Sequence, residues 1–147
     1  MKVYLDACCL SRLTDDQSQA RVRDEAEAVE HVFALIRVRK IDLISSEALE
    51  DEARRAPVPE RRLEAEILLS LASGTVDVDD AIAQRARDLA ALGYGVFDAL
   101  HVAAAESAGA DVLLSTDDRL IRRAGRGIGS PRIPVRNPVL WIQEQGL

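Results

Sequence analysis

Three aspartates interrupt otherwise apolar stretches of the sequence, and their side chains are the first candidates for chemistry. Asp6 follows a short apolar run near the N-terminus, and Asp117 follows another late in the chain. Asp98 lies in the segment 96–105, which is apolar nearly all round except for Asp98 and His101. A helix with this pattern is normally buried, so its carboxylate needs a partner, a metal ion or the helix N-terminus.

Carboxylates gathered at one place would favour a divalent cation. Like charges raise one another's pKa, and a hard cation with oxygen ligands relieves the repulsion. Mg²⁺ or Mn²⁺ suits such a set of ligands. An ion held there can activate water and neutralise the charge that develops on a phosphodiester. Asp6, Asp98 and Asp117 together therefore predict metal-dependent hydrolysis of a nucleic acid.

The elements expected around these acids would place Asp6 and Asp117 at the same edge of a sheet. Short apolar segments predict strands that alternate with helices, which favours a central, mainly parallel sheet covered on both faces. The expected fold is therefore α/β, a three-layer α/β/α sandwich. Sites in such folds lie beyond the carboxyl ends of the strands, where both aspartates fall. The expected strands cover 3–5, 41–44, 75–78 at a sheet edge, 111–115 and 133–135.

Helices are expected between these strands. A helix that begins after Pro59 would carry Leu63, Ile67 and Leu71 on one apolar face and end at Gly74. The other expected helices cover 22–36, 47–54 behind a serine cap, 80–92, 96–108 and 118–124.

Each candidate acid also has a purely structural alternative. Asp6 could serve only as a turn or cap residue, and Asp117 could cap the helix that follows it, a task that Asp118 could perform equally well. The dipole of the first helical turn could stabilise Asp98 without any function. His101 could be an internally bonded structural histidine, a ligand of the metal, or a residue that orients one of the ligands.

A fourth acid is expected from the acidic helix after the second strand. Its candidates are Glu47, Glu50, Asp51 and Glu52. Helical spacing places Glu52 beside the inward face, whereas the other three are expected to be mostly solvated. Periodicity alone does not choose among them.

Composition predicts one globular domain over residues 1–147. The chain is 48% hydrophobic, enough for a real core, and has no uninterrupted apolar stretch long enough for a membrane span. Asp6 interrupts any secretory segment, so we expect a cytoplasmic protein. The net charge of −6 argues against a surface that grips nucleic acid everywhere, although six arginines gather between positions 119 and 136. The adjacent Cys8 and Cys9 are expected to pack as small apolar side chains.

Three segments give the chain a family resemblance. It resembles the PIN-domain family, including the toxin nucleases of VapBC-type toxin–antitoxin modules. The opening Val3-Tyr4-Leu5-Asp6 carries the first part of the likeness, the central Phe97-Asp98-Ala99-Leu100-His101-Val102-Ala103-Ala104-Ala105 the second, and Leu113-Leu114-Ser115-Thr116-Asp117-Asp118-Arg119-Leu120 the third. The resemblance covers residues 1 to about 124, and the tail would supply the last strand.

The resemblance implies a PIN-like fold and an endoribonuclease that depends on Mg²⁺ or Mn²⁺. Asp6, Asp98 and Asp117 fall on the family's metal-binding acids, and Glu52 falls on its remaining glutamate. Ser115 stands where the family has a serine or threonine close to the metals. The family further implies an RNA substrate, a homodimer and a protein antitoxin whose tail blocks the site. One departure is Ala7, which replaces the serine or threonine that follows the first aspartate in many relatives.

Other acid-bearing α/β proteins fit less well. Haloacid-dehalogenase chemistry needs a second aspartate where Cys8 stands, and a response-regulator receiver needs a lysine after a late strand, whereas Lys2 and Lys40 are both early. The remaining alternative is a non-catalytic PIN-like module that binds RNA or protein. Ala7 and the acidic net charge favour that alternative.

Overall fold

Five parallel strands form one sheet at the centre of the molecule. The computed structural model describes residues 1–146, and the strand order is β3-β2-β1-β4-β5, with all four pairings parallel. The strands are β1 (Lys2–Leu5), β2 (Asp42–Ser46), β3 (Gly74–Val76), β4 (Val112–Leu114) and β5 (Val135–Arg136). The expected strands are confirmed, with shifted ends.

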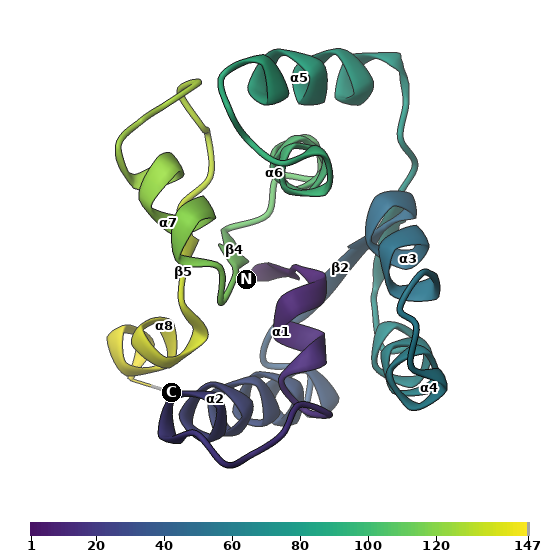
Figure 1. Cartoon of the computed structure of the whole chain (residues 1–147), viewed down its shortest axis with the longest axis vertical. Coiled ribbons are helices and arrows are strands. Elements are labelled where there is room, and N and C mark those ends of the chain that lie inside the picture. Colours follow the sequence, from purple (N-terminus) through teal and green to yellow (C-terminus); the bar gives the residue numbers. More distant parts are fainter. Residues whose placement is uncertain (147) are drawn as a thin grey trace.

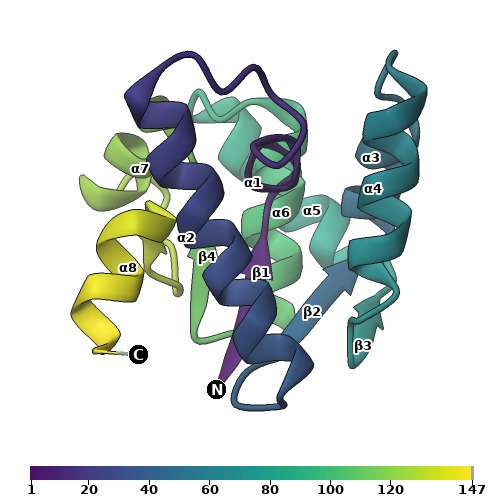
Figure 2. The ribbon, with the colours of Figure 1, turned by 90° about the horizontal axis from the view of Figure 1, so that it is seen from below.

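Helices cover both faces of this sheet, which confirms the three-layer α/β/α prediction. Figure 1 shows α5 and α6 on one side of the strands and α2 and α8 on the other. In Figure 2, α1 continues directly from the end of β1. The helices are α1 (Ala7–Ser11), α2 (Ala20–Arg37), α3 (Glu47–Arg54), α4 (Pro59–Leu69), α5 (Asp80–Ala91), α6 (Val96–Ser107), α7 (Asp118–Gly125) and α8 (Pro138–Gln145). Within the described residues, no helix is long and apolar enough to cross a lipid bilayer.

The central strand is the most buried part of the core. Val3, Tyr4 and Leu5 have no exposed surface, as expected for a parallel strand with helices on both faces. The stripe expected on the long helix is buried too, with Val29 and Phe33 of α2 at 1% exposure or less. This packing fixes β1, and therefore the residue that follows it.

The prediction for α4 was wrong in two respects. Leu63 and Ile67 are 60% and 52% exposed, and the helix buries Ala65, Leu68 and Leu69 instead. This second stripe has the i, i+3, i+4 spacing of a packed face, and through it α4 lies against α1 and α3. The helix also ends before the expected glycine stop, because a turn follows Leu69 and leads into β3.

Two helices were missed. α1 is a single turn whose capping residue is Asp6, so it is too short to show a periodic pattern. α8 begins at Pro138, behind an Asn137 side chain that accepts a hydrogen bond from the amide of Val139. The sequence carried that cap-and-proline signal, which is typical of a helix start.

Candidate functional site

Neighbouring strands carry the candidate acids to one edge of the sheet. β1 lies between β2 and β4, and all three run in the same direction, so their carboxyl ends meet. Asp6 follows β1, and its backbone amide donates to the carbonyl of Leu114 at 3.1 Å. Asp117 follows β4, and Glu52 lies on α3, directly after β2. The topology thus brings together segments separated by about a hundred residues.

Asp6 is held rigidly at the start of α1. The carboxylate is 3% exposed, and its Oδ1 accepts hydrogen bonds from the amide of Cys9 at 3.1 Å and from the thiol of Cys8 at 2.7 Å. Burial raises the pKa of Asp6 well above its ordinary value, and the nearby Cys8 adds to the rise. The role of N-cap was one of the alternatives left open for Asp6, and the structure shows that Asp6 does perform it.

Asp98 lies in the first turn of α6, and the other acids act on it electrostatically. Burial is the largest cause that raises the pKa of Asp98, to about 6. The negative charges of Asp6, Asp117 and Glu52 raise it further, while His101 opposes them. Charges act over limited distances in this way, so Asp6, Asp117 and Glu52 each lie within electrostatic reach of Asp98. The structure therefore places the other three predicted site residues around Asp98, although no three of these four acids within residues 1–146 have ligand atoms within 4.8 Å of one another.

Asp117 and Ser115 form the next part of the site. Asp117 caps α7, with its Oδ1 accepting from the amides of Arg119 at 2.9 Å and Leu120 at 3.4 Å. The hydroxyl of Ser115 accepts from the amide of Asp117 at 3.0 Å and lies 3.6 Å from the sulfur of Cys8. Ser115 therefore lies among the candidate acids, where the resemblance placed it.

Glu52 is the acid of α3 that turns toward the other three. Its Oε1 lies 2.8 Å from Nε2 of His101. By contrast, Glu47 is exposed and accepts from the amide of Val78, and Asp51 pairs with Arg55 at 3.1 Å. Glu50 lines a separate depression beside Arg54, whereas Glu52 is one of the charges that raise the pKa of Asp98. These contacts distinguish Glu52 from the other three acids of α3, which helical periodicity alone could not do.

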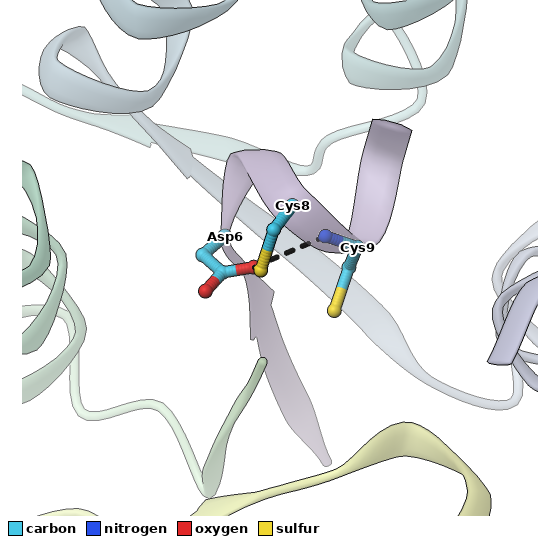
Figure 3. Close-up of side chains that lie close together, drawn as sticks. All are labelled: Asp6, Cys8 and Cys9. Carbon is cyan, nitrogen blue, oxygen red and sulfur yellow. Dashed lines mark hydrogen bonds between the residues drawn. The ribbon is translucent and has the colours of Figure 1, made fainter. Parts of the chain in front are cut away.

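The two cysteines differ from each other more than the sequence indicated. Cys9 is buried, as expected, whereas Cys8 is partly exposed and contacts Asp6. A hydrogen bond with Cys9 is the chief cause that lowers the pKa of Cys8 to about 6, against the effect of burial. Burial instead raises the pKa of Cys9, so the two neighbouring thiols are shifted in opposite directions. Figure 3 shows this group, the one set of three ligand-type side chains in the described residues whose ligand atoms all lie within 4.8 Å.

A depression beside Asp117 is lined with arginines. Arg119 and Arg122 are exposed there and form no ion pair with another described residue, while Arg21 is paired with Asp118 at 2.8 Å. Free guanidinium groups at an open edge suit phosphate oxygens. The arginine cluster noted in the sequence is therefore placed, in part, next to the acids.

The chemistry of these donors fits a hard divalent cation. The carboxylate of Asp98 accepts no hydrogen bond from any other described residue, and one oxygen each of Glu52 and Asp117 accepts none either. Carboxylate oxygens that repel one another and lack donors are the ligands that Mg²⁺ and Mn²⁺ prefer. A cation bound to Asp6 would compete with the hydrogen bond that the Cys8 thiol donates to this carboxylate.

Comparison with known proteins identifies the family of this chain. A family model described as PIN domain matches residues 3–126. The chain belongs to the PIN-domain family. No match was found among curated protein sequences.

Solved structures of VapBC proteins share the PIN fold of this chain. VapBC2 from Rickettsia felis, bound to a DNA fragment from its promoter, is 14% identical, with a TM-score of 0.61 over 93% of this chain and 98% of that one. Mycobacterium tuberculosis VapC20, described as a sarcin-ricin loop cleaving toxin, is 16% identical, with a TM-score of 0.59 over 87% and 97%. DNA-bound VapBC from Salmonella typhimurium is 20% identical, with a TM-score of 0.59 over 94% and 98%.

Proposed function

We propose that this PIN-domain protein is a metal-dependent endoribonuclease that hydrolyses RNA phosphodiester bonds. The observation that supports the proposal is the effect of Asp6, Asp117 and Glu52 on the pKa of Asp98, because three carboxylates must lie within electrostatic reach of the fourth to exert it. These four side chains would hold Mg²⁺ or Mn²⁺. When bound, the ion supplies an activated water and neutralises charge on the phosphodiester.

The chain's own residues would prepare the site for this ion. The amide of Cys9 orients Asp6, the amide of Arg119 orients Asp117, and His101 holds one oxygen of Glu52. The contacts of Asp117 and Glu52 each use one oxygen and leave the other oxygen of the carboxylate available for the ion. Arg119 and Arg122 lie beside Asp117 and would bind the RNA backbone on either side of the cut.

The same proposal extends to partners. Structural neighbours include VapBC complexes, so we propose that the chain is the toxin of a toxin–antitoxin pair, acts on RNA in the cytoplasm and forms a homodimer. Growth arrest on induced expression, relieved by the product of the adjacent upstream gene, supports the toxin role. Normal growth of the expressing cells contradicts it.

Cleavage of single-stranded RNA tests the nuclease directly. The purified protein should cut with Mn²⁺ and stop when EDTA is added. Asp6→Asn and Glu52→Gln should each lower the rate at least about a hundredfold, because each removes a charge that the ion needs. Glu50→Gln is the matched control on the same helix and should keep the wild-type rate.

The alternative is a non-catalytic module that binds RNA or protein. Ala7, which lacks the usual hydroxyl beside the first aspartate, and the net charge of −6 favour it. RNA binding that is unchanged by EDTA, without any cleavage by the wild type, would establish the module and overturn the nuclease.

A further inference from the structure

Four side chains form a continuous polar chain that ends on Glu52. The hydroxyls of Ser46 and Tyr4 lie 2.6 Å apart, and the Tyr4 hydroxyl lies 2.7 Å from Nδ1 of His101. Nε2 of His101 then lies 2.8 Å from Oε1 of Glu52. Ser46, Tyr4 and His101 are at most 1% exposed, so water does not compete for these bonds. The cluster joins β1, β2, α3 and α6.

Only one assignment of donors and acceptors along these four side chains gives every hydrogen-bonding group a partner. The amide of Leu49 donates to Ser46 at 3.0 Å, as the cap of α3. Ser46 then donates to Tyr4, Tyr4 donates to Nδ1 of His101, and Nε2–H donates to Glu52. Burial raises the pKa of Tyr4, so its hydroxyl keeps the proton that it donates. A doubly protonated imidazole would reverse the first links and leave the Ser46 hydrogen without an acceptor.

We propose that His101 is a positioning residue that fixes Glu52 in the orientation needed to bind the metal ion. Both ring nitrogens are occupied, so His101 is not itself a ligand. Glu52 is 29% exposed and has several rotatable bonds, and the bond to a buried imidazole leaves its Oε2 for the ion. Asp98 lies one turn before His101 on α6, so this helix would supply one ligand and orient another. The inference rests on the proposed metal site.

The ring of His101 also packs against two aromatic rings, which contributes to stability. The experiment must distinguish this structural contribution from the effect of His101 on Glu52. The His101 ring lies 6.3 Å from that of Phe97 and 5.6 Å from that of Tyr4. Loss of these contacts would lower stability in any variant that removes the ring. Loss of the bond to Glu52 would instead weaken Mn²⁺ binding, and only where the replacement lacks a donor.

Two variants of His101 provide this separation. His101→Gln keeps an N–H donor at the end of the side chain, whereas His101→Leu has similar size without one. Mn²⁺ dissociation constants, measured by electron paramagnetic resonance without RNA, should rise 10- to 100-fold in His101→Leu. In His101→Gln they should remain within a few-fold of the wild type, with urea unfolding recorded for both. Equal Mn²⁺ affinity in wild type and His101→Leu overturns the proposal.

A double variant and one spectrum complete the test. His101→Leu should add little to the loss already caused by Glu52→Gln, because both act through one carboxylate, and additive losses overturn the proposal. Nitrogen-15 NMR of the metal-free wild type should show the Nε2–H tautomer of His101, assigned with the aid of His31→Gln, and an Nδ1–H tautomer overturns it. If the wild type and Glu52→Gln bind Mn²⁺ equally, the role of Glu52 in the proposed function fails instead.

Discussion

At the scale of single residues, the four acids of the candidate site occupy unequal environments. Asp6 and Asp117 accept backbone amides at helix starts, and Glu52 accepts from an imidazole. Asp98 has none of these partners within residues 1–146, and burial together with its three acidic neighbours raises its pKa to about 6. Without a cation, Asp98 is therefore the acid whose charge is least compensated.

Replacing Asp98 should stabilise the metal-free protein at high pH. The folded-state pKa lies above the ordinary 3.8, so folding disfavours the ionised form. The stability that protonated Asp98 provides is complete below about pH 4 and is lost as the pH rises through about 6. Asp98→Asn should therefore be more stable than wild type at pH 8, by about 1 kcal/mol after allowing for solvent screening. Urea unfolding in EDTA between pH 4 and 8.5 measures this difference.

When Mn²⁺ is added, the wild type should instead be more stable than Asp98→Asn. The wild type would then gain stability from the ion, whereas Asp98→Asn would gain little. Asp51→Asn, on an exposed ion pair of α3, is the control and should show neither effect. A wild type that matches Asp98→Asn at pH 8 in EDTA would mean that neither burial nor the neighbouring acids disfavour the ionised form of Asp98.

At the scale of elements, Glu25 of α2 ties three separate segments together. Its carboxylate is 1% exposed and accepts from Arg12 at 2.8 Å, from Arg21 at 3.3 Å and from Asn137 at 2.6 Å. Arg12 follows α1, and Asn137 caps α8. Arg21 also holds Asp118, directly after the candidate ligand Asp117. The network therefore links α2 and α8, which cover one face of the sheet, to the segment that carries the candidate ligand Asp117.

Glu25→Ala should destabilise the fold strongly. Removal of the carboxylate leaves the Nε–H of Arg12 and the amide of Asn137 without their acceptor, although Nη1 of Arg12 keeps its pairing with Asp15, so we expect a cost of about 3 kcal/mol. The urea midpoint should fall accordingly. Asp51→Ala removes an exposed ion pair of another helix and should cost less than about 1 kcal/mol. Equal losses of stability in the two variants would show that the buried ion pairs of Glu25 contribute no more than the exposed ion pair of Asp51.

Most helices and strands could be predicted from short sequence patterns. The features that could not be predicted depend on contacts between residues far apart in the sequence. Ser46 caps α3 as expected, because a cap depends on residues three positions away. The apolar face of α4 was misjudged, since two stripes compete there and only contact with α1 and α3 chooses between them. Glu25 and Asn137 are 112 positions apart, beyond any local pattern. A tyrosine in a buried strand did signal that Tyr4 needs a polar partner, but not which one.

At the scale of the whole molecule, the candidate site belongs to no single element. Its acids come from the ends of β1 and β4 and from α3 and α6, and the parallel sheet is what holds them together. A local opening of any of these parts would separate ligands of the ion. Metal binding should therefore be coupled to the folding of residues 1–147 as one domain, which remains a prediction from the sequence.

This coupling predicts a single thermal transition that Mn²⁺ moves upward. An ion that binds only the native state adds about 2.7 kcal/mol at a hundred times its dissociation constant. For a chain of this size, that corresponds to a rise in Tm of roughly 5–10 °C. Calorimetry in EDTA and in Mn²⁺ at equal ionic strength measures the shift, and Asp6→Asn should abolish it while the unfolding remains one transition. Two transitions would divide the domain. A shift that survives in Asp6→Asn would place the ion elsewhere, since a cation at the proposed site must be bound by the Asp6 carboxylate, in competition with the hydrogen bond from the Cys8 thiol.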